Sequence, residues 1–268
     1  MPDQAHSLRS ASPPANTIPR LAALAVTGGK GGVGKTCMAV NLAIALAKTG
    51  LRPLLVDFDL GLANADVLLG IDPQRSLVDA VQGSATLAEL VVAVHGIGFV
   101  PAASGHDELT RLTQEQLHKL ITGLGTLAKG YDLLIIDTPA GIGREVMTAL
   151  RAARTTLVVL TPDPTSMTDA YALIKVLETA DPGRDLRILV NNCQDQHEAA
   201  ATYVRLRTVV QKFLKRDLPL AGWVPKDSQV VNAVRQRRPF VTTQQDGLAK
   251  TGILNLAAKL KGEISAWR

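Results

Sequence analysis

The segment VTGGKGGVGKT, residues 26–36, contains the side chains with the clearest chemistry in this 268-residue chain. Its second part fits G-x-x-x-x-G-K-[ST], the pattern of a glycine-rich loop that binds phosphates. The glycines let backbone N–H groups point toward phosphate oxygens, and the N-terminus of a following helix adds positive potential. We expect Lys35 to bind the β- and γ-phosphates and the Thr36 hydroxyl to bind Mg²⁺. The predicted phosphate-binding residues are Gly29, Lys30, Gly31, Gly32, Val33, Gly34, Lys35, Thr36 and Cys37.

A second lysine, Lys30, precedes Lys35 by five residues. It lies before the loop closes, so its side chain is not expected to reach the phosphates that Lys35 binds. Two interpretations remain open at this point. Lys30 is either a solvated surface lysine, or it projects toward a nucleotide bound by another subunit, as an arginine finger does in trans.

Acidic side chains follow two apolar segments downstream of the loop. Asp57 and Asp59 come at the end of PLLVD (53–57), and Asp137 ends YDLLIID (131–137). Ligands of open α/β sheets bind at the carboxyl ends of the strands. A magnesium nucleotide needs carboxylates there to hold metal-bound water and to orient an attacking water. A single aspartate can instead cap a strand or turn, but three in order beside an intact phosphate loop favour a site.

Alternating apolar and helical patterns predict the elements that position these residues. Four consecutive aliphatic residues in 131–137 are typical of a strand buried on both faces. The helix expected over 166–180 begins with the capping box Ser166-x-x-Asp169. The pattern predicts an α/β fold with a mostly parallel twisted sheet and helices on both faces. Strands are expected at 21–27, 53–57, 97–102, 131–137, 155–161, 186–192 and 218–225, and further helices at 36–48 and 113–129.

Domain organisation follows from the same reading. Residues 1–20 are polar and contain four prolines, so we expect a mobile tail, and residues 21–268 are expected to form one domain. The hydrophobic share of 46% is ample for a buried core. No apolar run approaches the roughly 18 residues of a membrane span, and no apolar signal region opens the chain. Two isolated cysteines are typical of the reducing cytosol and of neither a disulfide framework nor a zinc site.

The charge distribution limits the partners. From Arg184 onward there are 15 Lys and Arg residues against 7 Asp and Glu residues. A basic last third can face DNA, an anionic membrane or an acidic protein, although a solvated face is the more common explanation. Aromatic residues make up only 3% of the chain, which argues against stacking platforms for single-stranded nucleic acid. We expect no nucleic-acid partner, although contact of the basic last third with DNA stays open as an alternative.

Several motifs, in order, resemble one family. KGGVGKT (30–36) resembles the deviant Walker A motif of the MinD/ParA class of P-loop ATPases. VDFDLGLANADVLLG (56–70) resembles its switch I region, and DLLIIDTPAGIG (132–143) resembles its Walker B motif followed by switch II. LTPDPTSMTDAYALIKVL (160–177) and VPKDSQVVNAVRQRRPF (224–240) are also similar. Together the motifs are most similar to the FlhG (FleN) family of regulators of flagellar number.

The resemblance implies an ATP-dependent homodimer that hydrolyses ATP slowly with Mg²⁺. It implies that Lys30 crosses the dimer interface and that Asp59 positions the hydrolytic water. Asn64 would lie near the γ-phosphate, and the turn at 139–141 would sense that phosphate and switch on hydrolysis. The implied Mg²⁺ residues are Thr36, Asp57 and Asp137, the implied catalytic residues are Lys30, Lys35, Asp59 and Asn64, and the implied adenine-site residues are Asn191, Pro225 and Asp227.

The N-terminal tail contains a match to the DQAxxLR motif of the FlhG family. The matching residues are Asp3, Gln4, Ala5, Leu8 and Arg9. In that family the motif engages and activates the GTPase FlhF, so an FlhF-like GTPase is an implied partner. A segment this short is not helical alone and would fold on binding. A flagellar transcription activator and switch-ring proteins are the other partners that the resemblance suggests.

The C-terminal segment 252–268 has an apolar stripe at helical spacing: Ile253, Leu256, Leu260, Ile264 and Trp267. It is either an amphipathic membrane anchor or a final helix packed on the sheet, and the packing interpretation is favoured. The expected location is accordingly the cytoplasm, with peripheral attachment at the inner face of the cell membrane as the alternative. For the whole protein, the alternative function is a MinD/ParA-type cell-division or partitioning ATPase. That class lacks the N-terminal motif, and an iron–sulfur carrier would need paired cysteines.

Overall fold

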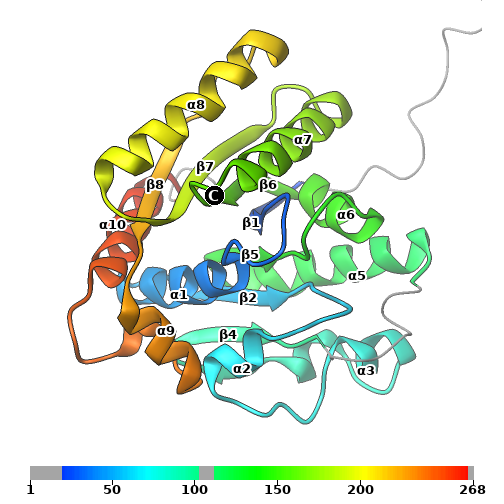
Figure 1. Ribbon diagram of the computed structural model, residues 1–268. Helices are drawn as coiled ribbons and strands as arrows, with labels where there is room; N and C mark the ends of the chain where they lie inside the picture. Colours follow the sequence, from blue (N-terminus) through cyan, green and yellow to red (C-terminus); the bar gives the residue numbers. More distant parts are fainter. Residues whose placement is uncertain (1–19, 103–111, 265–268) are drawn as a thin grey trace, which may run out of the picture.

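The computed structural model describes residues 20–102 and 112–264, which contain one eight-stranded sheet. The strand order is β3-β4-β2-β5-β1-β6-β7-β8, and every neighbouring pair is parallel except β3 with β4 (Figure 1). The strands are β1 (Leu21–Thr27), β2 (Pro53–Asp57), β3 (Val92–Val94), β4 (Ile97–Val100), β5 (Leu133–Asp137), β6 (Ala153–Leu160), β7 (Asp185–Cys193) and β8 (Leu220–Pro225). The helices are α1 (Lys35–Lys48), α2 (Ala65–Leu69), α3 (Leu77–Gln82), α5 (Gln114–Leu127), α6 (Arg144–Ala152), α7 (Pro164–Ala180), α8 (Gln196–Leu214), α9 (Ser228–Arg235) and α10 (Leu248–Ile264).

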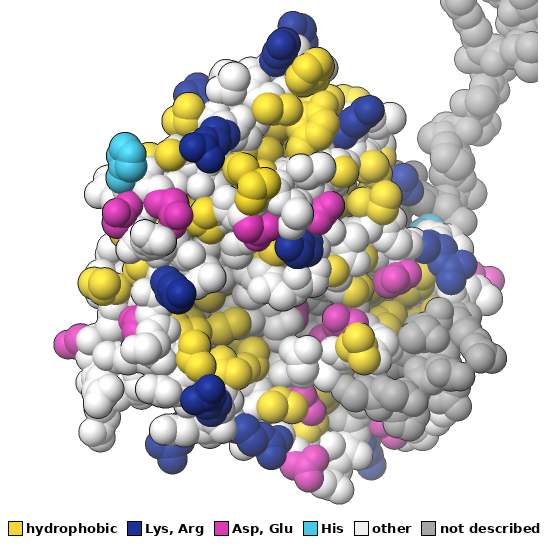
Figure 2. All heavy atoms as spheres, in the orientation of Figure 1, with side chains coloured by type: hydrophobic (Ala, Val, Ile, Leu, Met, Phe, Trp, Pro, Cys, Tyr) yellow, Lys and Arg dark blue, Asp and Glu magenta, His cyan; other side chains and the backbone are white. Residues whose placement is uncertain are grey.

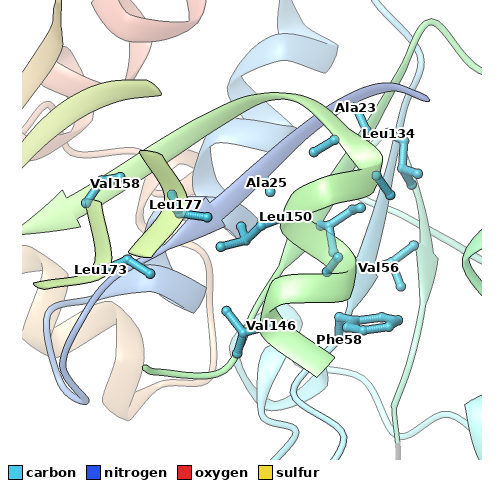
Figure 3. Packing of buried hydrophobic residues seen from close by; sticks show 14 of the residues in the cluster. Ala23, Ala25, Val56, Phe58, Leu134, Val146, Leu150, Val158, Leu173 and Leu177 are labelled. Carbon is cyan, nitrogen blue, oxygen red and sulfur yellow. The ribbon is translucent and has the colours of Figure 1, made fainter. Parts of the chain in front are cut away.

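Alternate residues of the central strands face two hydrophobic cores. On β1, Ala23 and Ala25 belong to the core under α5, α6, α7 and α8, whereas Leu24 and Val26 belong to the core under α1 and α10. Figure 3 shows part of the first core, where side chains of α6 and α7 meet those of β1, β2, β5 and β6. Burial on both faces explains the unbroken aliphatic runs of the sequence. The predicted fold class, a mostly parallel sheet covered on both faces, is confirmed.

Each predicted strand has a counterpart within a few residues, but the predicted start of α7 is wrong. The helix begins at Pro164 and is capped by Asp163, whose side chain accepts from Ser166 N at 2.8 Å. Proline is favoured in the first turn because its missing N–H would have no partner there. The Ser166 hydroxyl instead accepts from Thr161 N at 3.0 Å, which ties the helix to the end of β6. The capping box Ser166-x-x-Asp169 therefore does not exist.

Helix α10 buries the predicted apolar stripe as far as the structure describes it. Ile253, Leu256, Leu260 and Ile264 are each at most 2% exposed, in the core shared with α1. Packing on the sheet is thus confirmed for these four, while Trp267 lies outside the described residues. Across residues 20–102 and 112–264, no helix combines the length and hydropathy needed to span a bilayer.

Helix α8 leaves apolar side chains on its outer face. Val204, Val209 and Phe213 are 54%, 38% and 62% exposed. Figure 2 shows hydrophobic side chains gathered over α7 and α8, with Lys and Arg side chains around them. The sequence pattern had not predicted α8, because its buried side chains, Ala199, Thr202, Leu206 and Val210, are few for a 19-residue helix.

Candidate nucleotide-binding site

The glycine-rich loop connects β1 to α1 in the predicted way. Gly32 and Gly34 have φ angles of 79° and 92°, in the left-handed region that favours glycine. Gly34 is also the residue before α1, so the loop closes directly onto the helix N-terminus. A Cβ at Gly34 would lie 2.5 Å from Asn191 Nδ2, which shows how closely β7 approaches the loop. The backbone can therefore present its N–H groups and the helix dipole to an anion.

Gly29 packs against α7 more tightly than any side chain would permit. A Cβ there would lie 2.2 Å from the carbonyl oxygen of Asp169, a backbone atom in the first half of α7. We expect Gly29→Ala to lower the free energy of unfolding by about 1–3 kcal/mol or more, because loop and helix must separate. Gly31→Ala is the matched control, since a Cβ at Gly31 meets nothing within 4 Å, and it should change stability by about 0.5 kcal/mol or less. Urea unfolding of both variants measures the difference, and equal midpoints would contradict it.

The two lysines of the loop diverge. Lys35 is 8% exposed, and its ammonium donates to the carbonyl oxygen of Lys30 at 3.4 Å, inside the curl of the loop. Burial lowers the pKa of Lys35, while the carboxylates of Asp137 and Asp59 raise it. The Lys30 ammonium instead donates to Thr165 Oγ1 at 2.6 Å and lies 3.3 Å from Asp163 Oδ1, at the start of α7. Of these two lysines, only Lys35 directs its ammonium group into the phosphate loop.

Asp137 is the most electrostatically unusual residue of the site. It is completely buried at the end of β5, and no described residue hydrogen-bonds either carboxylate oxygen within normal geometry. Burial raises the pKa of Asp137 well above its usual value and the Asp57 carboxylate raises it further, whereas the Thr36 hydroxyl and the Lys35 ammonium lower it. Two buried carboxylates beside a single ammonium remain costly unless a further cation is bound. Carboxylate and hydroxyl oxygens are ligands that Mg²⁺ accepts, so Asp137 and Thr36 fit that ion.

Asp57 uses its carboxylate to hold the loop that follows β2. Oδ1 accepts from Asp59 N at 3.0 Å, and Oδ2 accepts from Asn64 N and Ala65 N at 3.1 Å each. Burial raises the pKa of Asp57 to about 6, although these three backbone bonds lower it. Lone pairs remain for a metal-bound water, so the Mg²⁺ role stays a prediction. What the contacts add is a direct connection between this carboxylate and the loop that contains Asp59 and Asn64.

The side chains of Asp59 and Asn64 face into their own loop in this structure. Asp59 Oδ1 accepts from Leu62 N at 3.1 Å, and Asn64 Nδ2 donates to the Leu62 carbonyl oxygen at 3.2 Å. Leu62 itself is 75% exposed. Asp59 is nevertheless close enough to Lys35 to affect its pKa. The structure therefore brings Asp59 to the phosphate loop and leaves the predicted role of Asn64 untested.

The turn after β5 contacts the phosphate loop. Gly141 N donates to the Gly28 carbonyl oxygen at 3.2 Å, and Gly141 has a φ of 93°. The next residue, Ile142, is 53% exposed. A movement of this turn would therefore be transmitted directly to the start of the loop.

A cavity of about 810 Å³ adjoins the loop on the side of α9. Its lining combines the loop residues 32–34 with Cys37, Asn191, Pro225 and Asp227, so the structure brings the predicted adenine-site residues together. Asn191 Nδ2 donates to the Val33 carbonyl oxygen at 2.9 Å. Burial raises the pKa of the Cys37 thiol to about 12, so this cysteine lines the cavity as an unreactive group.

Two parts of the site were not predicted from the sequence. The first is the pair Asp163 and Thr165, which binds Lys30. The second is the cavity wall formed by Val230, Val231 and Val234 of α9. Asp163-Pro164 is a helix-start signal that could have located the first, whereas the second depends on tertiary packing. The predicted partner-binding residues, Asp3, Gln4, Ala5, Leu8 and Arg9, lie outside the described residues.

Comparisons with known proteins agree with this geometry. A family model described as an AAA domain matches residues 22–188. The antiactivator FleN of Pseudomonas aeruginosa is 44% identical over 216 residues, which cover 80% of this chain and 77% of that protein. The flagellum site-determining protein YlxH of Helicobacter pylori is 34% identical over 90% of this chain and 82% of its own length.

Comparison with solved structures also identifies a MinD-like fold. The septum site-determining protein MinD of Pyrococcus horikoshii, solved in complex with Mg-ADP, superposes with a TM-score of 0.75 at 25% identity. The match covers 90% of this chain and 97% of that one. The chain therefore belongs to the MinD/ParA family of P-loop ATPases, among its FleN-like members.

Proposed function

We propose that this chain is a dimerising ATPase that acts as a nucleotide switch and regulates the number and placement of bacterial flagella. Its similarity to FleN and to a flagellum site-determining protein supports the flagellar assignment. The observation that carries the switch mechanism is the divergence of the two loop lysines. Lys35 lies within the loop, whereas Lys30 points away from it toward Asp163 and Thr165. An exposed ammonium held beside, but outside, its own phosphate site is suited to reach the nucleotide of a second subunit.

The residues of the site have distinct roles in this proposal. The loop N–H groups and Lys35 bind the phosphates of the subunit's own ATP, with Thr36 and Asp137 holding Mg²⁺. When bound, Mg²⁺ neutralises phosphate charge and polarises the terminal phosphate. Asp59 orients the attacking water, and Lys30 of the opposite subunit stabilises the charge that develops.

Asp57 couples hydrolysis to the loop conformation in the same scheme. It connects the Mg²⁺ surroundings with the loop that contains Asp59 and Asn64, through the three backbone bonds to its carboxylate. Asn64 would engage the γ-phosphate and release it after hydrolysis, which would return the loop to the arrangement seen here. Hydrolysis would thus alter the surface that carries the exposed apolar side chains of Leu62 and Ile142.

Partner binding is proposed to use the tail and the dimer together. Residues 21–268 would form the ATPase domain, and residues 1–20 would present the motif of Asp3, Gln4, Ala5, Leu8 and Arg9 to an FlhF-like GTPase. A flagellar transcription activator and switch-ring proteins are the further candidates. The location would be the cytoplasm, with peripheral contact at the inner face of the membrane as the alternative.

Sedimentation of the purified full chain with Mg²⁺ tests the proposal. A dimer is expected with ATP or a non-hydrolysable analogue, and a monomer with ADP. The same nucleotide conditions, with and without residues 1–20, are then applied to capture of the GTPase partner. A chain that stays monomeric with every nucleotide would overturn the switch, and capture that is indifferent to both the tail and the nucleotide would overturn the partner assignment.

A further inference from the structure

The outer wall of the nucleotide cavity is a short, weakly supported helix. Helix α9 has eight residues, and it presents Val230, Val231 and Val234 to the cavity. Val231 and Val234 are 51% and 40% exposed, so only part of their surface packs on the protein. A helix of two turns is not stable alone. The position of this wall must therefore depend on what holds its two ends.

One carboxylate holds the N-terminal end of α9 and also the start of α10. Asp227 Oδ1 accepts from Gln229 N of α9 at 2.9 Å, and its Oδ2 accepts from Ala249 N of α10 at 3.2 Å. An N-cap side chain ordinarily serves one helix. Here both oxygens of a single side chain are occupied by N–H groups of two helices that start 20 residues apart. Asp227 thereby fixes the first turn of α9 relative to α10.

The residue before α10 is adapted to this arrangement. A Cβ at Gly247 would lie 2.6 Å from Asp227 Oδ2 and 2.9 Å from Gln229 Oε1, so an added side chain would push on the ends of these two side chains. Gly247 has no left-handed backbone conformation that would itself require glycine. The pressure against a side chain at this position therefore comes from the close approach of the Asp227 carboxylate and the Gln229 amide.

Both anchors of α9 are rigid parts of the fold. Helix α10 lies tightly on β8, where a Cβ at Gly252 would be 3.0 Å from the Trp223 carbonyl oxygen. The segment after α9 is attached to the phosphate-loop helix α1. Val241 N donates to Asn41 Oδ1 at 2.9 Å, and Lys48 Nζ donates to the Val241 carbonyl oxygen at 2.7 Å. The wall is thus held between α10 at one end and α1 at the other.

We propose that Asp227 is a positioning residue for base recognition: its carboxylate joins α9 to α10 and so sets the apolar wall that packs on the adenine of bound ATP. This inference rests on the proposed function, because it takes ATP as the ligand. It differs from a direct contact, since the role is assigned to the two backbone hydrogen bonds that the carboxylate oxygens accept from α9 and α10. The base would meet the valine side chains of α9 and the backbone around Pro225.

Binding of ATP and of tripolyphosphate, which has the phosphates but no base, tests the proposal by calorimetry with Mg²⁺. Asp227→Ala is expected to raise the Kd for ATP about tenfold and to change the Kd for tripolyphosphate by less than about twofold. Gly247→Ala should give the same base-specific loss, although it keeps the aspartate. Asp227→Asn should be intermediate, because asparagine caps α9 well but turns an N–H₂ group toward one of the two donors.

Thr113→Ala is the matched control, because it removes the N-cap of α5, where Thr113 Oγ1 accepts from Gln116 N at 3.2 Å. It should lower the melting temperature and leave both Kd values unchanged. Equal weakening of ATP and tripolyphosphate by Asp227→Ala would overturn the proposal, as would wild-type binding by Gly247→Ala. Wild-type protein that binds ATP but does not dimerise would refute the proposed switch. The Kd values for ATP and tripolyphosphate could still be compared between the variants in that case.

Discussion

Lys30→Ala is expected to abolish ATP-dependent dimerisation and to leave the Kd of the monomer for ATP within about threefold of wild type. The reason is geometric: the Lys30 ammonium lies with Asp163 and Thr165, while Lys35 is curled inside the loop. Cations delivered in trans contribute about 10³–10⁵-fold to phosphoryl transfer, so hydrolysis should fall by at least about 10³-fold. Sedimentation, calorimetry and phosphate release measure the three quantities on the same preparation.

Release of Lys30 from its own subunit should cost little. The Lys30 and Asp163 side chains are 42% and 44% exposed, and an exposed ion pair contributes about 0–1 kcal/mol. A stronger contact to the phosphates of a second subunit can therefore replace it. Lys30 is consequently free to serve the dimer without loss of fold stability.

Substitutions of two other lysines serve as comparisons for Lys30→Ala. Lys35→Ala should lose nucleotide affinity itself, since that ammonium lies within the loop. Lys129→Ala, an exposed lysine before β5, should behave as wild type in all three measurements. If Lys30→Ala dimerises and hydrolyses ATP normally, the interpretation of Lys30 as a lysine acting in trans is wrong, and it is a solvated surface residue.

The sheet could be predicted from sequence because its strands are buried on both faces. The run 133–137 has burial at every position, and the sequence shows this directly as uninterrupted aliphatic residues ending in aspartate. The sequence predicts helix boundaries less accurately than strands. Two residues near the start of α7 are both favoured N-cap types, and only the tertiary packing determines which of them caps the helix. Asp163 caps the helix, whereas the Ser166 hydroxyl accepts from the backbone of Thr161.

The candidate site also has a part that the sequence could predict and a part that only the tertiary structure shows. Residues 29–37 could be predicted because their chemistry is local, with loop, lysine and hydroxyl in one segment. The contact of Lys30 with Asp163 joins residues 133 positions apart, and that of Asp227 with Ala249 joins residues 22 apart. Neither pairing leaves a periodic or spaced signal, because each depends on how separate helices pack at the carboxyl edge of the sheet. Sequence motifs therefore identified the residues of the site, and the tertiary structure identified the contacts that those residues make.

Asp137→Asn is expected to stabilise the Mg²⁺-free protein and to remove Mg²⁺-dependent hydrolysis. Burial and the nearby Asp57 carboxylate raise the pKa of Asp137 in the folded state, so the folded protein binds more protons than the unfolded chain. Stability then falls as pH rises through the interval between the unfolded and folded pKa values, and at neutral pH the carboxylate destabilises the fold. Asparagine removes this charge at nearly constant volume.

The expected gain is about 1–3 kcal/mol in the free energy of unfolding without Mg²⁺, or about 2–4 °C in melting temperature per kcal/mol. The variant should also lose most of the pH dependence that Asp137 contributes, which thermal melts across a pH series measure. Adding Mg²⁺ and ATP should stabilise wild type more than the variant, since binding only to the folded state raises its apparent stability and the variant lacks a Mg²⁺ ligand. Asp72→Asn, at an exposed aspartate, should change neither stability nor hydrolysis.

The combination of a more stable fold with lost hydrolysis separates a metal-holding carboxylate from a structural one. A structural aspartate would destabilise the protein when replaced, because its hydrogen-bond donors would be left without an acceptor. Within the described residues Asp137 has no such donors in normal geometry, so its buried charge is explained by the cation it would hold. A variant that melts earlier than wild type without Mg²⁺, or that hydrolyses ATP at the wild-type rate, would show that Asp137 does not hold the metal.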